Sequence, residues 1–288
     1  MTVDLHCHST ASDGGFSPTA LVARAFSNGV TQLALTDHDQ LAGLVEARAK
    51  ADELGMSFIN GVEISVTWQN LTVHIVGLNI ALDHLPLNDG LKKMADGRRE
   101  RAREMAAQLA EVGIEGAYEG ALAHANGRVD LISRTHFARF LVAQKKSHHV
   151  RAVFNDYLVA GKPGFVEHRW TSLQEAIDWI NGAGGVAVLA HPGRYPYTEE
   201  GQESVLFDDF IVAGGRAVEV VTGSHSKKQY ALYAEKARQY GLLASAGSDF
   251  HALNESRMDI GQVPALLTGR DAGVMRAWCI GLAFTDVL

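Results

Sequence analysis

This chain has few cysteines, no excess of positive charge and no long apolar runs. Only Cys7 and Cys279 are cysteines among 288 residues, one near each end. Two such residues form neither a disulfide framework nor a cysteine-rich zinc site, and they fit a reducing compartment. No apolar run approaches the ~20 residues that span a bilayer, and the N-terminus lacks the charged and apolar regions of a secretory signal. We therefore expect a cytoplasmic protein with no membrane partner.

The charge balance excludes a strongly basic protein. Lysine and arginine number 26 against 33 acidic residues, a formal net charge of −7. Such a surface does not favour duplex DNA, so no duplex partner is expected. Apolar and charged fractions of 47% and 20% are ordinary for a globular chain. The length allows one large domain, or one domain with a sizeable insertion.

Histidine, by contrast, is abundant, and two of the 13 stand near the start as His6-Cys7-His8. The preceding residues predict a short strand, in which His6 and His8 point one way and Cys7 the other. Two imidazoles so placed can share one divalent metal ion, and Asp13 on the following loop adds an oxygen ligand. A buried, hydrogen-bonded pair of histidines is the alternative, and this motif alone does not decide between them.

Segments typical of strands and helices alternate in the first and last parts of the chain. Strands are expected at 31–36, 57–65, 71–77, 185–190, 217–221 and 242–246. A helix begins at Ser17-Pro18 and carries its apolar residues, Phe26 among them, on one face. This alternation indicates a parallel α/β domain, formed by residues 1–82 and 164–288. Residues 83–163 show helical patterns only and predict an all-helical insertion domain.

Histidines and carboxylates recur within these strands or just beyond their ends. In parallel α/β folds the active site forms at the carboxyl ends of the strands, so we expect these side chains to converge. The candidate metal ligands are His6, His8, Asp13, His38, Glu63, His74, His191, Asp249 and His251. They are too many for one tetrahedral zinc and suit about two or three ions bridged by carboxylates. Mixed ligation of this kind suits Mn²⁺, Fe²⁺ or Zn²⁺ without choosing among them.

Six ordered motifs from residue 1 to about 262 resemble those of the PHP (polymerase and histidinol phosphatase) family of amidohydrolase-like, metal-dependent hydrolases. They are His6-Cys7-His8-Ser9, Thr36-Asp37-His38-Asp39, Gly61-Val62-Glu63, His74-Ile75-Val76-Gly77, Leu189-Ala190-His191-Pro192 and Gly247-Ser248-Asp249-Phe250-His251. The resemblance implies a distorted TIM-like (β/α)7 barrel. It also implies divalent metal cofactors, with Mn²⁺ as the expected ion and Zn²⁺ or Fe²⁺ as alternatives.

The same resemblance implies how the ligands divide among three ions. His6, His8, Glu63 and Asp249 would bind the first ion. Glu63, His74 and His191 would bind the second, and Asp13, His38 and His251 the third. Of these residues, Glu63, Asp249 and His191 are the expected catalytic ones.

The helical insertion resembles the branch with 3′,5′-nucleoside bisphosphate phosphatases and 5′-to-3′ exoribonucleases, in which it covers the barrel mouth. Its segments 131–139 and 161–163 carry this likeness. The implied activity is hydrolysis of the 3′-phosphate of 3′,5′-bisphosphonucleotides, with trimming of short RNA from its 5′ end. A hydroxide bridging two ions would attack phosphorus. The expected partners are a nucleotide and short single-stranded RNA.

Cationic side chains are expected to hold the substrate phosphates. Arg194 directly follows the His191 turn, and Arg134, His136 and Lys162 lie on the insertion. Each has an alternative as a surface charge or as the partner of a carboxylate. His225 follows a strand end and is a candidate for substrate contact or proton donation. Tyr195 is a candidate for stacking on a base, with core packing as its alternative.

Two other functions compete with this one. The first is another PHP hydrolase, resembling a histidinol phosphatase or a DNA exonuclease. The second is a non-catalytic regulatory module that metals stabilise. The full ligand set argues against the second, because a structural role does not need several ions in an open mouth. The helical insertion argues against a bare histidinol phosphatase.

Overall fold

The computed structural model describes residues 2–264, which form two compact units. One comprises the chain up to Gly90 together with the chain from Thr171 onward, and the other is Leu91–Trp170. The sequence predicts the insertion at 83–163, so each boundary lies several residues further along than expected. The reason at the first boundary is helix α3 (Leu85–Glu111), which begins before Gly90 and continues through the second unit.

The first unit is a nearly closed barrel of seven strands. Their order is β1 (Val3–Asp4), β2 (Gln32–Leu35), β3 (Ser57–Trp68), β4 (Leu71–Leu78), β6 (Val186–Leu189), β7 (Ala217–Thr222) and β8 (Leu243–Gly247), with β5 (Thr171–Ser172) paired to β3. The ends approach where the Leu5 N–H donates to the Ala246 carbonyl at 3.0 Å. Cys7 also forms a parallel bridge with Phe250. The expected distorted barrel is confirmed.

One strand departs from the expected parallel arrangement. β4 pairs antiparallel with both β3 and β6, whereas the other neighbours on the barrel path are parallel. Only Gln69 and Asn70 separate β3 from β4, and so short a link permits a hairpin but no crossover. Because β4 is reversed, its beginning lies at the edge where parallel strands end, and His74 lies near that beginning.

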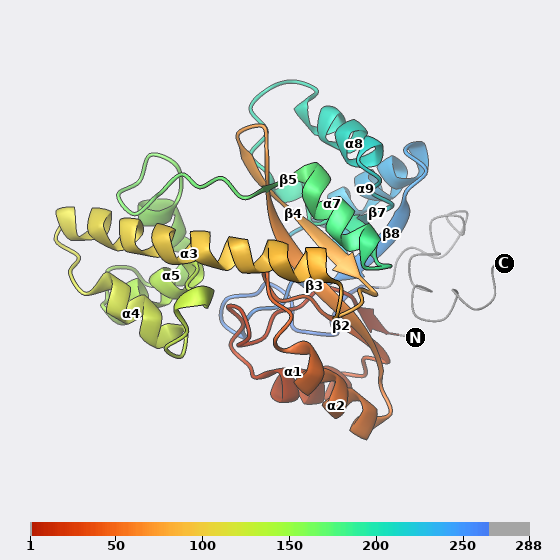
Figure 1. Cartoon of the computed structure of the whole chain (residues 1–288), viewed down its shortest axis with the longest axis horizontal. Helices are drawn as coiled ribbons and strands as arrows, with labels where there is room; N and C mark the ends of the chain where they lie inside the picture. Colours follow the sequence, from red (N-terminus) through yellow and green to blue (C-terminus); the bar gives the residue numbers. More distant parts are fainter. Residues whose placement is uncertain (1, 265–288) are drawn as a thin grey trace. The chain divides into compact units, whose positions relative to one another are not determined.

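Helices α1 (Pro18–Ser27), α2 (Leu44–Leu54), α7 (Leu173–Gly182), α8 (Gln202–Val212) and α9 (Lys227–Gln239) flank the strands. Figure 1 shows α1 and α2 beside β2 and β3, and α9 beside β7 and β8. Ser17 caps α1 by accepting the Ala20 N–H at 3.2 Å, and Pro18 occupies its first turn, as expected. The prediction that Phe26 lies on the buried face of α1 is wrong, because this residue is 45% exposed.

Two apolar clusters hold the barrel together. One fills the space between the sheet and helices α1 and α2, with Leu21, Leu33 and Phe250 fully buried. The other includes Leu5, Ala34, Ile59, Val76 and Val188. Each fully buried leucine or phenylalanine contributes about 1.5–3 kcal/mol to folding. The site described below therefore stands on strands that are fixed by packing on both sides.

The second unit contains helices and turns only. After α3 come α4 (Ala117–His124), α5 (Arg134–Ala143) and α6 (Val150–Val153), with single helical turns at Val129–Leu131 and Phe154–Leu158. Its own core includes Leu109, Phe137 and Leu141. At Gly120 a Cβ atom would lie 2.0 Å from the Phe140 ring, so this close approach of α4 and α5 requires glycine. That this unit covers the barrel mouth stays a prediction.

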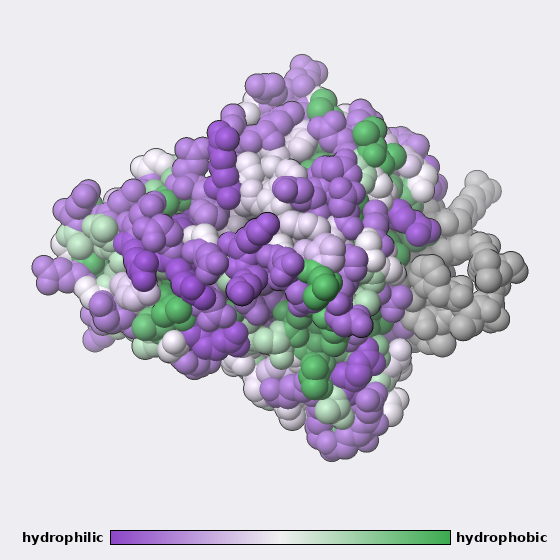
Figure 2. Space-filling view, viewed as in Figure 1, coloured by the Kyte–Doolittle hydropathy of each residue, from purple (hydrophilic) through white to green (hydrophobic). Residues whose placement is uncertain are grey.

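The face of the protein in Figure 2 is mostly hydrophilic, with apolar side chains in scattered patches. Single exposed residues such as Val45 and Val212 are normal for a folded chain. Within residues 2–264, no helix combines the length and the apolar character needed to cross a membrane.

Candidate metal centre

Most of the candidate ligands lie beyond strand ends that the backbone fixes against one another, whereas Glu63 and His74 lie within β3 and β4. His6 and His8 follow β1, and Asp249 follows β8. The Asp249 N–H donates to the His6 carbonyl at 2.8 Å, and the His8 N–H donates to the Phe250 carbonyl at 2.9 Å. Gly247 permits this contact, because a Cβ atom there would lie 2.3 Å from the His6 Cβ. The first and last strands thus bring residues more than 240 positions apart into one site.

Glu63 stands at the centre of the cluster and is fully buried. Its Oε1 lies 2.8 Å from His74 Nδ1 and 3.0 Å from His191 Nε2. Its Oε2 lies 2.9 Å from His38 Nδ1 and 3.3 Å from the Nε2 atoms of His6 and of His8. Five imidazoles thus lie around one carboxylate, and donor atoms of these kinds fit divalent metals.

All nine sequence-predicted ligands come together in four overlapping groups. Within each group the donor atoms lie within 4.8 Å of one another. The groups are His8, Asp13, His38 and His251; His6, Glu63 and His191; His6, His8 and Asp249; and His38, Glu63 and His74. The division differs from the expected one, since His191 is grouped with His6 and not with His74. His8 also joins the group of Asp13 and His251, which shows how closely the sets interlock.

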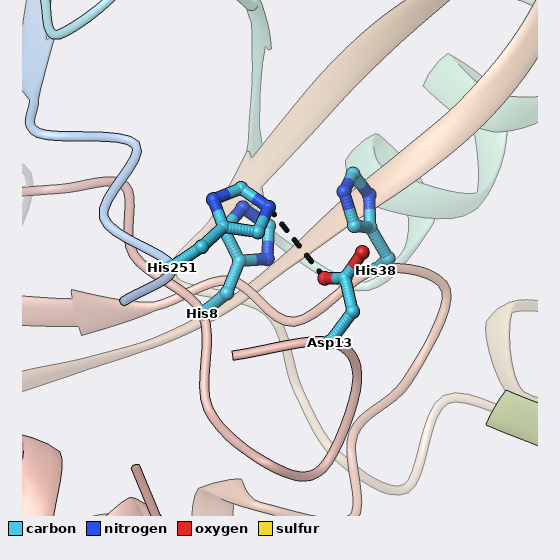
Figure 3. A group of neighbouring side chains, drawn as sticks. All are labelled: His8, Asp13, His38 and His251. Atoms are coloured by element: carbon cyan, nitrogen blue, oxygen red, sulfur yellow. Dashed lines mark ion pairs between the residues drawn. The ribbon is translucent and has the colours of Figure 1, made fainter. Parts of the chain in front are cut away.

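Figure 3 shows the group that contains Asp13. The rings of His8 and His251 lie 4.1 Å apart between centroids, and His251 Nε2 lies 3.5 Å from Asp13 Oδ1. Asp13 belongs to a loop that the buried carboxylate of Asp37 fixes. Asp37 accepts the Ser9 N–H and hydroxyl, both at 2.7 Å, and the Ser12 hydroxyl at 2.6 Å. This support holds the oxygen donor at the imidazoles.

The electrostatics keep the carboxylates ionised. Burial acts to raise the pKa of Glu63, but His38, His74 and His6 lower it well below its ordinary value. The pKa of Asp249 is also lowered well below its ordinary value, because His6 and His8 outweigh the effect of burial. These two carboxylates therefore carry negative charge that the cluster must balance with cations.

Two of the imidazoles have a lowered pKa, which favours the neutral form that binds a metal. Burial lowers the pKa of His74 to about 4, and it lowers the pKa of His251 to about 4. His8 differs, because hydrogen bonds with Asp249 and Glu63 outweigh burial and raise its pKa to about 10. A proton on His8 thus competes with a metal ion for the same carboxylates.

Some buried polar atoms in the cluster lack a hydrogen-bond partner, and a bound cation would serve as their partner instead. Within residues 2–264, His8 Nδ1 and His38 Nδ1 have no hydrogen-bond partner, and His38 Nδ1 lies 2.9 Å from Glu63 Oε2. Leaving a buried polar group unsatisfied costs about 1–3 kcal/mol. A divalent ion between such lone pairs removes that cost. Imidazole nitrogens with carboxylate oxygens form a donor set that fits divalent metals.

Sequence reasoning missed one residue that supports this cluster and left the role of another open. Glu219 lies in the apolar strand β7, the same signal that pointed to Glu63, and it contacts His6 and His191. Tyr195 is buried, which fits core packing rather than stacking on a base. Its hydroxyl donates to the Ala190 carbonyl at 2.7 Å and accepts the His74 N–H at 2.9 Å. Tyr195 thereby fixes the backbone next to His74 and His191.

The barrel unit carries two candidates for substrate binding, Arg194 and His225, and Arg194 has a side-chain contact with a proposed metal ligand. Arg194 Nη1 is 3.2 Å from Asp249 Oδ2, and its side chain is 53% exposed. His225 instead donates from Nδ1 to the Val220 carbonyl at 3.1 Å and accepts the Gly193 N–H on Nε2 at 3.0 Å. Backbone groups occupy both ring nitrogens, and the expected substrate contact or proton donation by His225 stays a prediction. His225 holds the turn that carries Arg194.

The three candidates on the helical unit have separate surroundings. Arg134 begins α5 and lies 5.6 Å from the Phe154 ring centre. His136 is buried, and its Nδ1 accepts the Ser133 N–H at 3.0 Å as part of a capping box at the start of α5. Lys162 is exposed in a turn closed by its N–H to the Val159 carbonyl at 3.0 Å. Their substrate-binding role stays a prediction.

Comparison with known proteins decides the family. A model of the PHP domain matches residues 4–181. The chain belongs to the PHP domain family. PHP proteins of this kind are metal-dependent phosphoesterases, and the chain is an enzyme of that class.

Similar PHP proteins extend the match to most of the chain. It is 48% identical over 264 residues to the 3′,5′-nucleoside bisphosphate phosphatase of Chromobacterium violaceum, covering 92% of each chain. It is 43% identical over 250 residues to the 5′-3′ exoribonuclease Rnm of Escherichia coli K12, covering 86% of this chain and 84% of that one. An amidohydrolase from C. violaceum, solved with bound sulfate and no metal, has 47% identity and a TM-score of 0.89, with 93% of each chain covered. These relatives do not favour the histidinol phosphatase and DNA exonuclease alternatives.

Proposed function

We propose that this PHP protein removes the 3′-phosphate from 3′,5′-bisphosphonucleotides and also trims short RNA from its 5′ end. The observation that carries the proposal is a match of 48% identity, over 92% of each chain, to a protein named for the first of these activities. The second activity rests on the similarity to an exoribonuclease. Both reactions hydrolyse phosphate esters of nucleotides, so one centre can serve both.

The proposed metal ligands are the nine side chains that converge around Glu63, and the proposed ion is Mn²⁺. When bound, such ions supply Lewis acidity and lower the pKa of a coordinated water toward neutrality. The residues of the chain contribute charge and position. Glu63 and Asp249 stay ionised, and both would hold the ions through their carboxylate oxygens. The backbone N–H groups of His191 and Asp249 hold these residues beyond their strand ends. The first donates to the Glu219 carboxylate and the second to the His6 carbonyl.

Arg194 is the proposed ligand for the phosphoryl group under attack. Its guanidinium lies 3.2 Å from Asp249 and is half exposed, so it can reach both the cluster and an incoming anion. A guanidinium binds two phosphate oxygens at once, which a lysine cannot do. The relative solved with sulfate binds a tetrahedral anion of the same kind. For the second phosphate of the substrate we propose Arg134, His136 and Lys162.

Phosphate release from a panel of esters tests the proposal. The panel holds 3′,5′-bisphosphoadenosine, adenosine 5′-monophosphate, histidinol phosphate and a 5′-phosphorylated RNA tetramer, each with Mn²⁺. The bisphosphate should be hydrolysed fastest, with adenosine 5′-monophosphate as product, and the RNA should shorten from its 5′ end. Activity on histidinol phosphate alone would contradict the proposed substrate. Activity on none of the esters would contradict the catalytic role.

A further inference from the structure

Strand β7 carries a buried carboxylate, Glu219, that is outside the nine proposed ligands. Its side chain is 1% exposed, and its neighbours Val218 and Val220 are buried as well. Among the described residues, none of the groups able to hold a metal includes Glu219. An ionised carboxylate in such surroundings is costly unless its oxygens are paired. Its partners therefore indicate what it does.

Each oxygen of Glu219 binds a different candidate ligand of the cluster. Oε1 accepts a hydrogen bond from His6 Nδ1 at 2.7 Å, and Oε2 accepts a hydrogen bond from the backbone N–H of His191 at 2.7 Å. A carboxylate is an acceptor only, so the proton of the His6 ring lies on Nδ1. In the neutral form of His6, which is the form that binds a metal, Nε2 then carries the lone pair, and it faces Glu63 at 3.3 Å and Asp249 at 3.6 Å.

The second contact holds an unfavourable backbone conformation. His191 has φ 29° and ψ 55°, in the left-handed region that side chains other than glycine rarely adopt. Such a conformation costs about 1–3 kcal/mol and persists only where surrounding contacts fix it. The short bond from the His191 N–H to Glu219 is such a contact. It places the His191 ring with Nε2 at 3.0 Å from Glu63 Oε1.

We propose that Glu219 is a positioning residue that sets the tautomer of His6 and the backbone of His191, and thereby raises the affinity of the centre for divalent ions. The inference rests on the proposed function only in taking the cluster as a metal centre. Histidine ligands usually donate their second ring nitrogen to a carboxylate or carbonyl, and losing that partner weakens metal binding about 10–100-fold. Glu219 differs in orienting two ligands from one carboxylate.

Substitution by glutamine separates this role from simple space filling, because the amide has the same shape but one acceptor only. If the amide oxygen faces the His191 N–H, the amide N–H₂ faces His6 Nδ1 and moves the ring proton to Nε2. If the amide oxygen faces His6, the His191 N–H loses its acceptor. Either arrangement damages one ligand, whereas the packing of β7 is preserved.

The test measures Mn²⁺ binding directly, by competition with a fluorescent chelator on metal-stripped protein. E219Q should bind Mn²⁺ about 10–100-fold more weakly than the unmodified protein. Excess Mn²⁺ should restore most of kcat, with the KM for 3′,5′-bisphosphoadenosine unchanged. The matched control is E200Q, which removes an exposed carboxylate from the same unit and should leave Mn²⁺ affinity unchanged.

Each result decides the matter. Equal Mn²⁺ affinity in E219Q and the unmodified protein would overturn the inference. Loss of the fold in E219Q, seen by circular dichroism, would overturn it as well, because the carboxylate would then serve the barrel and not the ligands. If the unmodified protein itself bound no divalent ion, the proposed function would fail first. Weaker binding by a folded E219Q would support the inference.

Discussion

The barrel unit and the helical unit gather opposite charges. At the strand ends of the barrel, buried carboxylates such as Glu63 and Asp249 stay ionised and attract cations. The helical unit instead holds guanidinium groups against aromatic rings, with Arg98 4.7 Å and Arg101 5.5 Å from the Trp170 ring centre. Burial, together with the charges of Arg134 and Arg98, lowers the pKa of Arg101 to about 9.

This contrast fits the proposal that the two units bind different groups, metal ions in the barrel unit and a substrate phosphate in the helical unit. Carboxylates fixed on a packed sheet suit metal ions, which need ligands held in position. Arginines on a separate helical core suit phosphate groups, which differ in number and spacing between a nucleotide and an RNA. Metal binding and substrate binding should then respond to different substitutions. The predictions below test that separation.

The largest effect is expected from Glu63→Ala. This change removes the carboxylate on which five imidazoles converge, so metal content and phosphatase activity should fall together by more than about 100-fold. Elemental analysis after dialysis and phosphate release measure the two quantities, with circular dichroism to confirm folding. A folded variant that kept both its metal and its activity would contradict the assignment of the centre to the barrel.

Phe137→Ala should destabilise the helical unit without emptying the metal centre. Phe137 is fully buried in that unit, and truncating such a ring costs about 3–5 kcal/mol. Denaturant unfolding measures the loss, and elemental analysis should find the metal retained. The control is Val112→Ala, at a position that is 50% exposed, where a change within about 0.5 kcal/mol is expected. Metal loss in folded Phe137→Ala would show that the units are not separable.

Arg134→Ala should affect substrate binding alone. Losing a hydrogen bond to a charged group costs about 1.5–3 kcal/mol, which corresponds to a rise in KM for 3′,5′-bisphosphoadenosine of about 10–100-fold. Metal content should not change. Arg103→Ala removes an exposed arginine of the same unit and serves as the control. An unchanged KM in Arg134→Ala would remove Arg134 from the proposed phosphate site.

The smallest effect is expected from Ser172→Ala in the barrel unit. The Ser172 hydroxyl caps α7 by accepting the Glu175 N–H at 3.2 Å, within a capping box. Losing this cap should cost about 1 kcal/mol. Because bound metal stabilises the unit that holds it, excess Mn²⁺ should raise Tm in the variant and in the unmodified protein by the same amount. A Tm that ignores Mn²⁺ in both would contradict metal binding by this unit.

Much of the site could be predicted because carboxylates and histidines are unusual within apolar strands and directly after them. A carboxylate in an apolar strand needs a cation, and histidines at strand ends meet at one edge, so the nine side chains could be expected to converge. Glu219 gave the same signal as Glu63 and was overlooked, since no motif surrounds it. The family membership followed from the ordered motifs and is confirmed.

The remainder depended on geometry that local sequence does not encode. The direction of β4 follows from the length of the Gln69-Asn70 link, which periodicity ignores. The start of α2 at Leu44 is set by a turn over residues 41–44, which the Leu44 N–H closes by donating to the Leu41 carbonyl. The partners of the His225 ring could not be predicted, because they are backbone groups of strand β7 and of the turn after His191.

Removal and return of metal tests the central claim most directly. Protein stripped with a chelator and assayed in metal-free buffer should release no phosphate from 3′,5′-bisphosphoadenosine. Adding Mn²⁺ should restore turnover in the unmodified protein and not in Glu63→Ala. Full turnover by the stripped protein would contradict the account.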